Sequence, residues 1–539
     1  MKYEYHNETL QDLILEAAKH YADKPAFWCM GASFSYHDFL TRAQHFSNYC
    51  REVLKLKKGD RLAVMLPNLL SYPIAIFGAT LAGLVVVNIN PMDKAENLQH
   101  ELSDSGAKAI VVLENVAHEL EKVIVDTALE HVIIASVGGL QGPVKRLLIN
   151  GYLRWIKKAI PAYTLKRTVR FREVLKIGVG FPFQRVEVNA QDLAFIQYTG
   201  GTTGIAKGVM LSHKNLMSNL FQVRVWVDHY LTEGKEVILT ALPLYHIFSL
   251  LVNCFLFIKL GGKNILVPDP RNIPDLVKVM HKTQYTCLTG VNTLFNALLH
   301  NPAFRAMDHS RMKMVIGGGM AVQKPIADAW QALTHSVIIE GYGLTEASPV
   351  VTINPATTQQ FTGSIGLPIA ATELSIQDKK GHCLPPQKIG ELCIKGPQVM
   401  EGYYGRPEET KKALKNGWLH TADAAYVDER GFYFIVDRLK DMVIVSGFNV
   451  YPAEVEKTLK TLAGVNEVAV IGIPDEAHGE VVKAFIVREE GATLTAQQVI
   501  DFAHQHLASY KCPHQIEFLS ALPKSTVGKI LKKDLKNLH

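Results

Sequence analysis

Short apolar runs rich in β-branched residues alternate with helical patterns over the first two thirds of the chain. The runs are RLAVMLPN (61–68), LVVVNIN (84–90), AIVVLE (109–114), HVIIAS (131–136), EVILTALPL (236–244), KNILVPD (263–269) and MVIGGG (314–319). Uninterrupted apolar runs of this length are typical of strands that are buried on both faces of a parallel sheet. The pattern therefore predicts layered α/β sheets that are largely parallel.

The pattern changes from about Gly363 onward. Short strands and turns are indicated by TELSIQD (372–378), GELCIKG (390–396) and GFYFIVD (431–437), and further strands by MVIVSG (442–447), EVAVIGIPD (467–475) and KAFIVRE (483–489). Two helical stretches accompany the last three strands. We therefore expect an α/β protein with two domains. The large N-terminal domain, residues 1–438, would hold layered α/β sheets plus a β-rich lobe, and the small α+β C-terminal domain would span residues 439–539.

Two apolar runs are long enough to be compared with membrane spans. YPIAIFGATLAGLVVVNIN (72–90) is interrupted by glycines and ends in β-branched residues, which favours a buried helix that leads into a buried strand. LPLYHIFSLLVNCFLFIKL (242–260) contains His246, Ser249 and Asn253, which favours a core helix over a spanning one. We expect both runs to lie in the protein core.

Length and composition add limits to this picture. A chain of 539 residues exceeds what one hydrophobic core usually supports, and 48% hydrophobic with 20% charged residues is typical of a soluble globular protein. The seven cysteines are scattered without a CxxC pair, which argues against a disulfide framework and a zinc site. The charged N-terminus, MKYEYHNETL, does not resemble a signal peptide, so we expect a cytoplasmic protein.

The net charge of +6 is concentrated in one segment. From His131 to Arg172 there is no acidic residue, and the nine basic ones are Lys145, Arg146, Arg154, Lys157, Lys158, Lys166, Arg167, Arg170 and Arg172. On a helical wheel, Leu148, Tyr152, Trp155, Ile156, Ala159 and Ile160 fall on one side, opposite Arg146, Arg154, Lys157 and Lys158. The segment is either a solvated insertion or an amphipathic patch on an anionic membrane. No recognition motif accompanies it, so we expect no nucleic-acid partner.

A loop of unusual composition, YTGGTTGIAKG (198–208), follows the apolar run DLAFIQ. Its glycines free backbone amides, its threonines offer hydroxyls, and Lys207 adds a positive charge, all of which suit a phosphate. It is not a Walker loop, because Lys207 follows Ala206 and precedes Gly208. An ordinary solvated turn is the alternative.

Further along the chain, several charged residues offer nucleotide chemistry. Glu346, in EGYGLTEASP, is a plausible magnesium ligand, and Asp423 with Arg438 suits ribose hydroxyls and phosphate. Lys529 stands on a glycine-containing turn in LPKSTVGKILKKDL. Taken singly, each of these residues is equally compatible with a solvated surface charge.

Taken together and in this order, these stretches resemble the adenylate-forming superfamily. The similarity runs from about residue 10 to the C-terminus and includes YTGGTTGIAKG, LPLYHIFSL, EGYGLTE, GELCIKGPQVMEGYY, GWLHTADAA, VDRLKDMVIVSGFNVYPAEVE and LPKSTVGKILKK. Within the superfamily, the chain looks most like bacterial long-chain fatty-acid–CoA ligases. The resemblance implies an ATP-dependent ligase with a mobile C-terminal domain, which converts a long-chain fatty acid to its acyl-CoA through an acyl-adenylate.

The resemblance also implies roles for individual residues. The loop from Tyr198 would hold the phosphates of ATP, through Thr199, Gly200, Gly201, Thr202, Thr203, Gly204 and Lys207. The adenine pocket would include Gly318, Gly341, Tyr342, Gly343 and Thr345, and the ribose would contact Asp423 and Arg438. Thr199 and Glu346 would share Mg²⁺. Lys529 would bridge substrate and α-phosphate oxygens, and Lys440 would be the hinge of the C-terminal domain. Gly447 would help to frame the CoA tunnel, and His246 would lie at the junction of the acyl pocket and this tunnel.

Two residues depart from the family pattern. Ala206 replaces the usual proline, and Ala422 replaces the usual glycine before Asp423. If that backbone needs a positive φ, the methyl group of Ala422 adds strain near the ribose.

The expected substrates are a long-chain fatty acid, ATP and CoA. Other expectations are peripheral contact with the inner face of the cytoplasmic membrane and a possible homodimer. Three alternatives remain open: a medium-chain or aryl acid–CoA ligase, an acyl-AMP ligase that loads a carrier protein, and a non-catalytic nucleotide- or lipid-binding protein.

Overall fold

The computed structural model describes residues 5–199, 206–446, 448–475, 478–525, 528 and 530–537. The chain forms two compact units. The larger comprises residues 1–363, 368–372 and 395–414, and the smaller comprises residues 364–367, 373–394 and 415–539. The smaller unit thus combines the predicted β-rich lobe with the C-terminal part of the chain. The predicted boundary between residues 438 and 439 marks where a mobile C-terminal domain would begin. This boundary stays a prediction.

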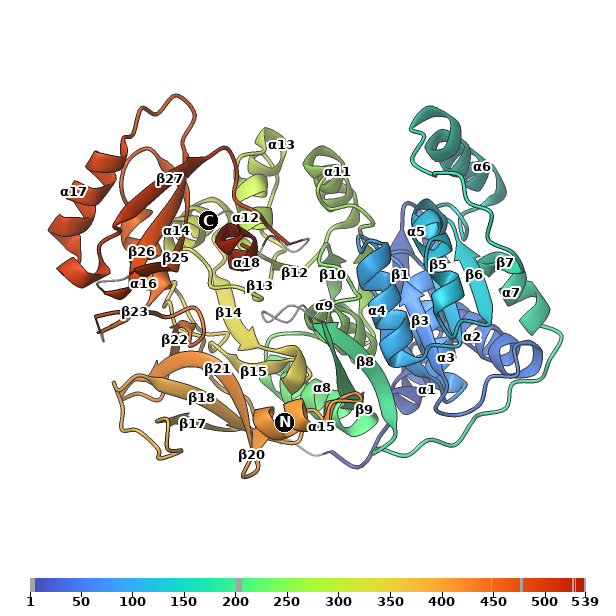
Figure 1. The fold of residues 1–539 in the computed structure, drawn as a ribbon. Coiled ribbons are helices and arrows are strands. Elements are labelled where there is room, and N and C mark those ends of the chain that lie inside the picture. The colour runs from blue at the N-terminus through green and yellow to red at the C-terminus, as the bar shows by residue number, and fades with distance from the viewer. Residues whose placement is uncertain are drawn as a thin grey trace. The chain divides into compact units, whose positions relative to one another are not determined.

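The first sheet of the larger unit has the strand order β19-β9-β8-β4-β3-β5-β6-β7 (Figure 1). Its strands are β3 (Arg61–Met65), β4 (Val85–Asn88), β5 (Ala109–Leu113), β6 (His131–Ala135), β7 (Thr168–Arg170), β8 (Leu193–Thr199), β9 (Lys207–Ser212) and β19 (Gly402–Tyr403). Neighbours from β8 to β7 are parallel, whereas β9 is antiparallel to β8 and β19 is antiparallel to β9. Every residue of β4 and β5 is buried, as expected for central strands covered on both faces.

The second sheet of this unit includes the path β15-β14-β13-β12-β10-β11-β1-β2. Its strands are β1 (Pro25–Cys29), β2 (Ala32–Ser35), β10 (Val237–Thr240), β11 (Lys263–Leu266), β12 (Cys287–Gly290), β13 (Met314–Gly317), β14 (Ile338–Gly343) and β15 (Val350–Ile353). Pairing is parallel from β14 to β1 and antiparallel at the ends of this path. The predicted layers of largely parallel strands are therefore confirmed.

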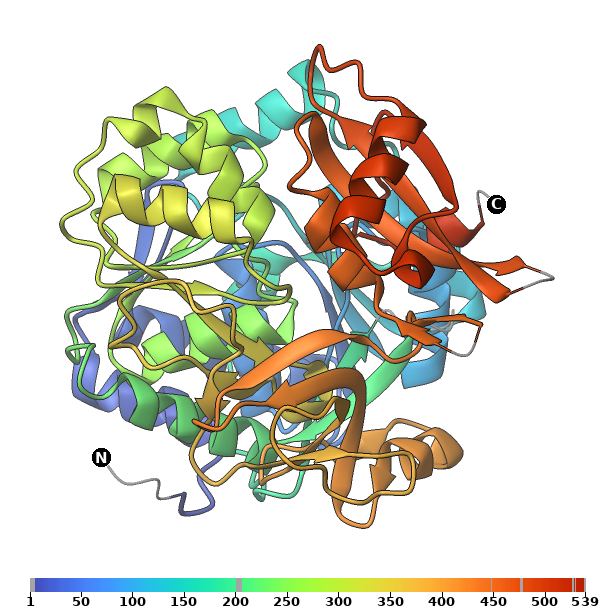
Figure 2. The same cartoon turned by 90° about the vertical axis from the view of Figure 1, so that its left-hand side faces the viewer.

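Helices cover these sheets and bury their apolar faces against them. The main ones are α1 (Leu10–Tyr21), α2 (Tyr36–Asn48), α3 (Ser71–Leu81), α4 (Ala95–Ser105), α5 (Ala117–Glu121), α7 (Phe171–Gly178), α8 (His213–Val227), α11 (Ile273–Thr283), α12 (Asn292–Leu299), α13 (Pro302–Arg305), α14 (Lys324–Thr334) and α15 (Pro407–Ala413). The yellow-green helices α11, α12 and α14 lie together on one side of the second sheet, where Phe295 and Trp330 belong to its core (Figure 2). Capping boxes at Thr9, Ser35 and Ser212 start α1, α2 and α8.

Both long apolar runs lie in the core, as predicted. Every residue of α3 is buried, and the chain continues into the buried strand β4. The second run forms α9 (Ile247–Ser249), the π-helical segment η5 (Leu250–Phe255) and α10 (Leu256–Lys259), and η5 is buried throughout. Among the described residues, no helix combines the length and apolarity that crossing a membrane requires.

The basic segment forms an exposed helix at the edge of the first sheet, where Figure 1 shows α6 standing above β7 and α7. It consists of α6 (Pro143–Gly151) and the π-helical turn η4 (Tyr152–Ile156), neither of which has a buried residue. The helix ends earlier than the helical wheel implies, since Ala159 and Ile160 follow it and Lys158 has a φ of 49°.

The smaller unit contains two largely antiparallel sheets, in which the last strand, Gln515–Leu519, is parallel to its neighbour. The first joins β17 (Glu373–Gln377), β18 (Gly390–Lys395), β21 (Trp418–Val427) and β22 (Tyr433–Arg438); the second joins β23 (Val443–Val445), β24 (Phe448–Val450), β25 (Val465–Asp475), β26 (Gly479–Arg488) and β27 (Gln515–Leu519). Helices α16 (Pro452–Leu459) and α17 (Ala496–His506) share an apolar core with the second sheet, and α18 (Lys532–Lys536) follows near the C-terminus. The α+β prediction for the C-terminal region is confirmed.

Candidate active site

The predicted phosphate loop joins two antiparallel strands at the edge of the first sheet. β8 ends at Thr199 and β9 begins at Lys207, and these two residues lie opposite each other in the ladder. The predicted positions Gly200, Gly201, Thr202, Thr203 and Gly204 lie outside the described residues. The structure therefore fixes the two ends of the loop to one another.

Helix α4 anchors both ends of this loop. On the side of β8, the Tyr198 hydroxyl donates to Asp104 Oδ2 at 2.8 Å, and on the side of β9, His100 Nε2 lies 2.8 Å from the carbonyl oxygen of Ala206. His100 and Asp104 are four residues apart, so they lie on one face of α4. Burial raises the pKa of Tyr198 well above its usual range, which keeps this hydroxyl a donor. Sequence reasoning missed both α4 residues, because neither belongs to a motif.

Tyr403 links the loop to the predicted metal ligand. Its hydroxyl donates to Glu346 Oε1 at 2.8 Å, while its ring lies 5.1 Å from Lys207 Nζ. Burial, with a contribution from the Glu346 carboxylate, raises the pKa of Tyr403 well above its usual range. Lys207 Nζ also pairs with Glu409 Oε2 at 2.5 Å. The structure thus brings Lys207 and Glu346 together around a tyrosine that the sequence analysis did not single out.

The two predicted adenine segments lie at the ends of neighbouring parallel strands. Gly317, directly before Gly318, pairs in register with Glu340, directly before Gly341, on β13 and β14. Gly318 lies just beyond β13, Gly341 continues β14, and a Cβ at Gly343 would lie 2.1 Å from the Pro349 carbonyl oxygen. Only glycine fits that last position. Parallel strands place their carboxyl ends on one edge of a sheet, where ligands commonly bind.

Tyr342 and Thr345 lie on the same segment. Tyr342 is opposite Thr352 in the ladder with β15, and Thr345 begins the short 3₁₀ helix η6 (Thr345–Ala347), which also carries Glu346. The predicted adenine residues and the predicted metal ligand are therefore neighbours on one turn of chain.

Glu340 links β14 to the chain that follows β13 through a buried carboxyl group. Its Oε1 accepts from the Val322 backbone N–H at 2.8 Å, and its Oε2 has no hydrogen-bond partner in the part of the chain that the structure describes. Burial raises the pKa of Glu340 to about 7. Glu340 lies inside the EGYGLTE motif, but no role for it was predicted from the sequence.

His246 lies at the start of α9, beside the Tyr245 ring, with ring centroids 4.6 Å apart. Burial lowers its pKa to about 4, so the imidazole is neutral at ordinary pH. Its Nε2 atom is buried without a hydrogen-bond partner among the described residues. This arrangement differs from a satisfied core histidine and leaves a nitrogen available to a ligand.

The predicted ribose residues meet in the smaller unit. Asp423 on β21 pairs in register with Arg438 on β22, and the Arg438 Nε lies 2.7 Å from Asp423 Oδ1. Asp423 is buried and Arg438 is half-exposed, so the guanidinium is positioned by a carboxylate that solvent does not reach. Lys440 follows two residues later on a turn.

Ala422 has the backbone conformation that the family's usual glycine suggests, with a φ of 57°. Glu391 holds this turn, since its Oε1 accepts from the Ala422 N–H at 3.0 Å and its Oε2 lies 2.8 Å from His420 Nδ1. The Leu439 N–H donates to the Ala422 carbonyl at 2.9 Å. The methyl group is therefore strained immediately before Asp423, and Glu391 is a positioning residue that sequence reasoning missed.

Two further predicted residues, Lys529 and Gly447, lie outside the described residues. Their predicted roles rest on sequence alone.

The chain matches the AMP-binding enzyme family over residues 14–404 and the AMP-binding enzyme C-terminal domain over residues 454–529. A long-chain-fatty-acid–CoA ligase of Salmonella typhimurium is 48% identical over 530 residues, covering 98% of this chain and 94% of the relative. The chain therefore belongs to the AMP-binding enzyme family, and the resemblance to adenylate-forming enzymes is confirmed.

Solved structures support the fold. ATP-bound MatB from Rhodopseudomonas palustris is 29% identical, with a TM-score of 0.81 over 99% of each chain. The anthranilate CoA ligase AuaEII in complex with anthranoyl-AMP has a TM-score of 0.87 over 100% of this chain and 99% of that one. At 23% identity, the second comparison supports the fold alone.

Replacing Ala422 with glycine is expected to stabilise the protein. Relief of the left-handed strain is worth about 1–2 kcal/mol, against about 0.5–1 kcal/mol for the flexibility of glycine in the unfolded chain. We expect the free energy of unfolding to rise by up to about 1 kcal/mol, measured by denaturant titration. Ala424→Gly, at a buried position of the same strand without positive φ, is the control and should destabilise. Equal destabilisation by both changes would contradict the assignment of strain.

Replacing Glu340 with glutamine is expected to change how stability depends on pH. The folded pKa of about 7 exceeds the ordinary value of 4.5, so the stability contributed by the neutral carboxyl is complete below about pH 4.5 and is lost as pH rises through 7. The amide stays neutral, so Glu340→Gln should match the wild type near pH 4.5 and exceed its unfolding free energy by roughly 3 kcal/mol at pH 8. Glu408→Gln, at an exposed position, should show no such divergence. Parallel pH profiles for wild type and Glu340→Gln would refute the burial argument.

Proposed function

We propose that this protein is an AMP-forming long-chain fatty-acid–CoA ligase. The observation that carries the proposal is the full-length similarity to a ligase of that specificity, in a chain that has Lys207, Glu346, Asp423 and Arg438 at the positions of the expected motifs. These residues weigh against a non-catalytic binding protein. In the larger unit, the contacts of Lys207 and Glu346 with Tyr403 support a phosphate and metal role for these two residues. In the smaller unit, the ion pair of Asp423 with Arg438 supports their role as ribose contacts.

In the first half-reaction, the fatty carboxylate attacks the α-phosphate of ATP, an acyl–phosphate bond forms, and pyrophosphate leaves. The role of the protein is to position the reactants and neutralise charge. Lys207 and the loop amides would hold the departing phosphates. When bound, Mg²⁺ would neutralise phosphate charge, and Glu346 with Thr199 offers the hard oxygen ligands that it prefers. Lys529 would bridge the carboxylate and the α-phosphate.

In the second half-reaction, the CoA thiol attacks the acyl carbon and AMP leaves. The C-terminal domain, residues 439–539, would rotate about Lys440 between the two steps, and Gly447 would help frame the CoA tunnel. His246 suits the junction of acyl pocket and tunnel, because a neutral ring with a free nitrogen can accept a hydrogen bond without adding charge.

The proposed enzyme acts in the cytoplasm and touches the inner face of the cytoplasmic membrane through its basic segment. The support is the exposure of large apolar side chains on α6 and η4, with Trp155 and Ile156 exposed by 70% and 72%. Such side chains beside lysines and arginines suit an anionic bilayer. A homodimer remains a further prediction.

A panel of acids tests the proposed specificity. Each buried methylene contributes about 0.8 kcal/mol, so the apparent KM should fall roughly fourfold per methylene from octanoate toward palmitate until the pocket is full. Pyrophosphate and AMP release, measured with and without CoA, reports the turnover. A flat or rising KM series, or better turnover of benzoate, would favour a medium-chain or aryl ligase. Turnover that needs a carrier protein instead of CoA would favour the loading ligase.

The role of Lys529 separates the two half-reactions. Lys529→Ala should lose about 3 kcal/mol of transition-state stabilisation in adenylation, which is a hundredfold or more in rate. Thioester formation from supplied acyl-adenylate and CoA should stay within a few-fold of wild type. Lys533→Ala, an exposed lysine on α18, is the control for loss of a C-terminal charge. Equal losses in both half-reactions would contradict domain rotation.

A further inference from the structure

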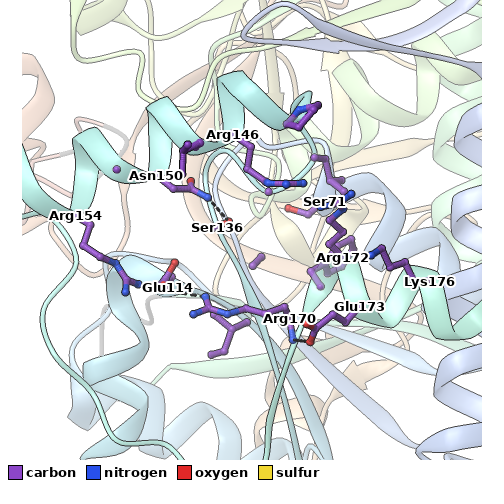
Figure 3. A pocket seen from close by; sticks show the side chains of 18 of the residues that line it. Ser71, Glu114, Ser136, Arg146, Asn150, Arg154, Arg170, Arg172, Glu173 and Lys176 are labelled. Atoms are coloured by element: carbon purple, nitrogen blue, oxygen red, sulfur yellow. Dashed lines mark hydrogen bonds and ion pairs between the residues drawn. The ribbon is translucent and has the colours of Figure 1, made fainter.

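A pocket of about 580 Å³ lies beneath the exposed helix of the basic segment, and Figure 3 shows it from close by. One wall is the helix itself, with Arg146, Asn150 and Arg154 at successive i, i+4 positions. The opposite wall carries Arg170, at the end of β7, with further lining residues from α7. The helix therefore covers a chamber and is more than a solvated insertion.

The lining of this pocket is strongly cationic. It contains the basic residues Arg146, Arg154, Arg170, Arg172 and Lys176 and only two acidic ones, Glu114 and Glu173. The excess of three positive charges is confined to one concave surface. Because like charges at close range repel, such a lining favours occupation by an anion.

Glu114 organises two of the arginines. Its carboxylate is buried and pairs with Arg154 from the helix and with Arg170 Nη1 at 2.9 Å from the opposite wall (Figure 3). Tyr163 adds a hydroxyl at 3.3 Å. Each guanidinium has five N–H donors and uses only part of them here, so both arginines are positioned and still able to donate to a ligand.

The remaining charged residues of the lining are three cations and Glu173, which together contribute a net charge of +2. Arg146, Arg172 and Lys176 make no ion pair within the ranges of chain that the structure describes. All three line the same pocket, from α6 and α7. Three cationic groups that converge on one space match the three terminal oxygens and two negative charges of a phosphate monoester.

The exposed apolar side chains of the helix indicate that the source of this anion is a membrane lipid. Val144, Leu148, Tyr152 and Ile156 follow one another at i, i+4 spacing, are all exposed, and do not line the pocket. Trp155 lines the pocket and is itself largely exposed, so the pocket opens beside the apolar stripe. If that stripe enters a bilayer, the pocket lies at headgroup level.

We propose that this pocket binds the phosphate monoester headgroup of an anionic phospholipid, such as phosphatidate. The inference rests on the membrane contact proposed above and adds a specific lipid site to it. The apolar stripe supplies partitioning, while the arginine-lined pocket supplies headgroup recognition. A free phosphate compound shares the headgroup chemistry, and a fatty carboxylate, with two oxygens and one charge, leaves part of the cationic lining without a partner.

Sedimentation of the full-length protein with vesicles tests the proposal. Phosphatidylcholine vesicles carry either phosphatidate or phosphatidylglycerol, a phosphodiester, in amounts adjusted to equal surface potential. We expect the wild type to bind phosphatidate vesicles roughly tenfold more tightly, as for additional charge-assisted hydrogen bonds. The pocket variant Arg146→Gln/Arg172→Gln/Lys176→Gln should lose this preference. Arg154 is left in place, because its loss would leave Glu114 with one fewer cation.

The control variant Lys157→Gln/Lys158→Gln/Lys166→Gln removes the same charge from residues that do not line the pocket. It should weaken binding to both vesicles equally and keep the phosphatidate preference. Both variants should turn over octanoate like the wild type, which shows that they are folded.

The possible failures are distinct. If the wild type binds neither vesicle, the membrane contact fails and the lipid site with it. Equal binding to both vesicles, or a preference that the pocket variant retains, overturns the lipid site alone. Equilibrium dialysis with inorganic phosphate completes the test: tight binding without any vesicle preference would assign the pocket to a soluble phosphate compound and overturn the lipid source.

Discussion

The antiparallel pairing of β8, β9 and β19 is the constraint on which the proposed chemistry of the larger unit depends. The pairing sets Thr199 opposite Lys207 and brings Tyr403 beside them, and Tyr403 in turn holds the carboxylate of Glu346. Strand pairing and the Tyr403 side chain thus fix the positions of the charged groups that we propose act on a triphosphate. Preorganised charge of this kind avoids reorganisation during the reaction. The His100 and Asp104 contacts from α4 extend the same frame to both ends of the loop.

In the smaller unit, one predicted site residue follows a strained backbone position. Asp423 and Arg438 are set by strand register, but the turn before Asp423 keeps an alanine at positive φ, which Glu391 holds in place. Strain of this type is tolerated where surrounding contacts over-determine the backbone. Glycine would relieve the strain and also loosen the turn. The alanine therefore costs stability but restricts the backbone beside Asp423, a proposed ribose contact.

Much of the fold was accessible from the sequence, because buried parallel strands appear as continuous apolar runs and motif order identifies the family. The resemblance to the family predicted four of the site residues, namely Lys207, Glu346, Asp423 and Arg438. Asp104, Tyr403 and Glu391 were not, since their roles come from contacts between segments far apart in sequence, which no local pattern reports. The pocket under α6 was missed for the same reason. A helical wheel displays the polar face of one helix but not the arginines that β7 and α7 place opposite it.

We propose that the Tyr403 hydroxyl positions Glu346 for the nucleotide. The most direct test is ATP–pyrophosphate exchange by Tyr403→Phe, followed as a function of Mg²⁺ concentration. We expect an exchange rate roughly ten- to a hundredfold lower and a higher Mg²⁺ requirement, with an unchanged KM for the fatty acid and an unchanged unfolding midpoint. Tyr404→Phe, at the next position, should behave like the wild type. An unaltered Mg²⁺ dependence in Tyr403→Phe would contradict the account.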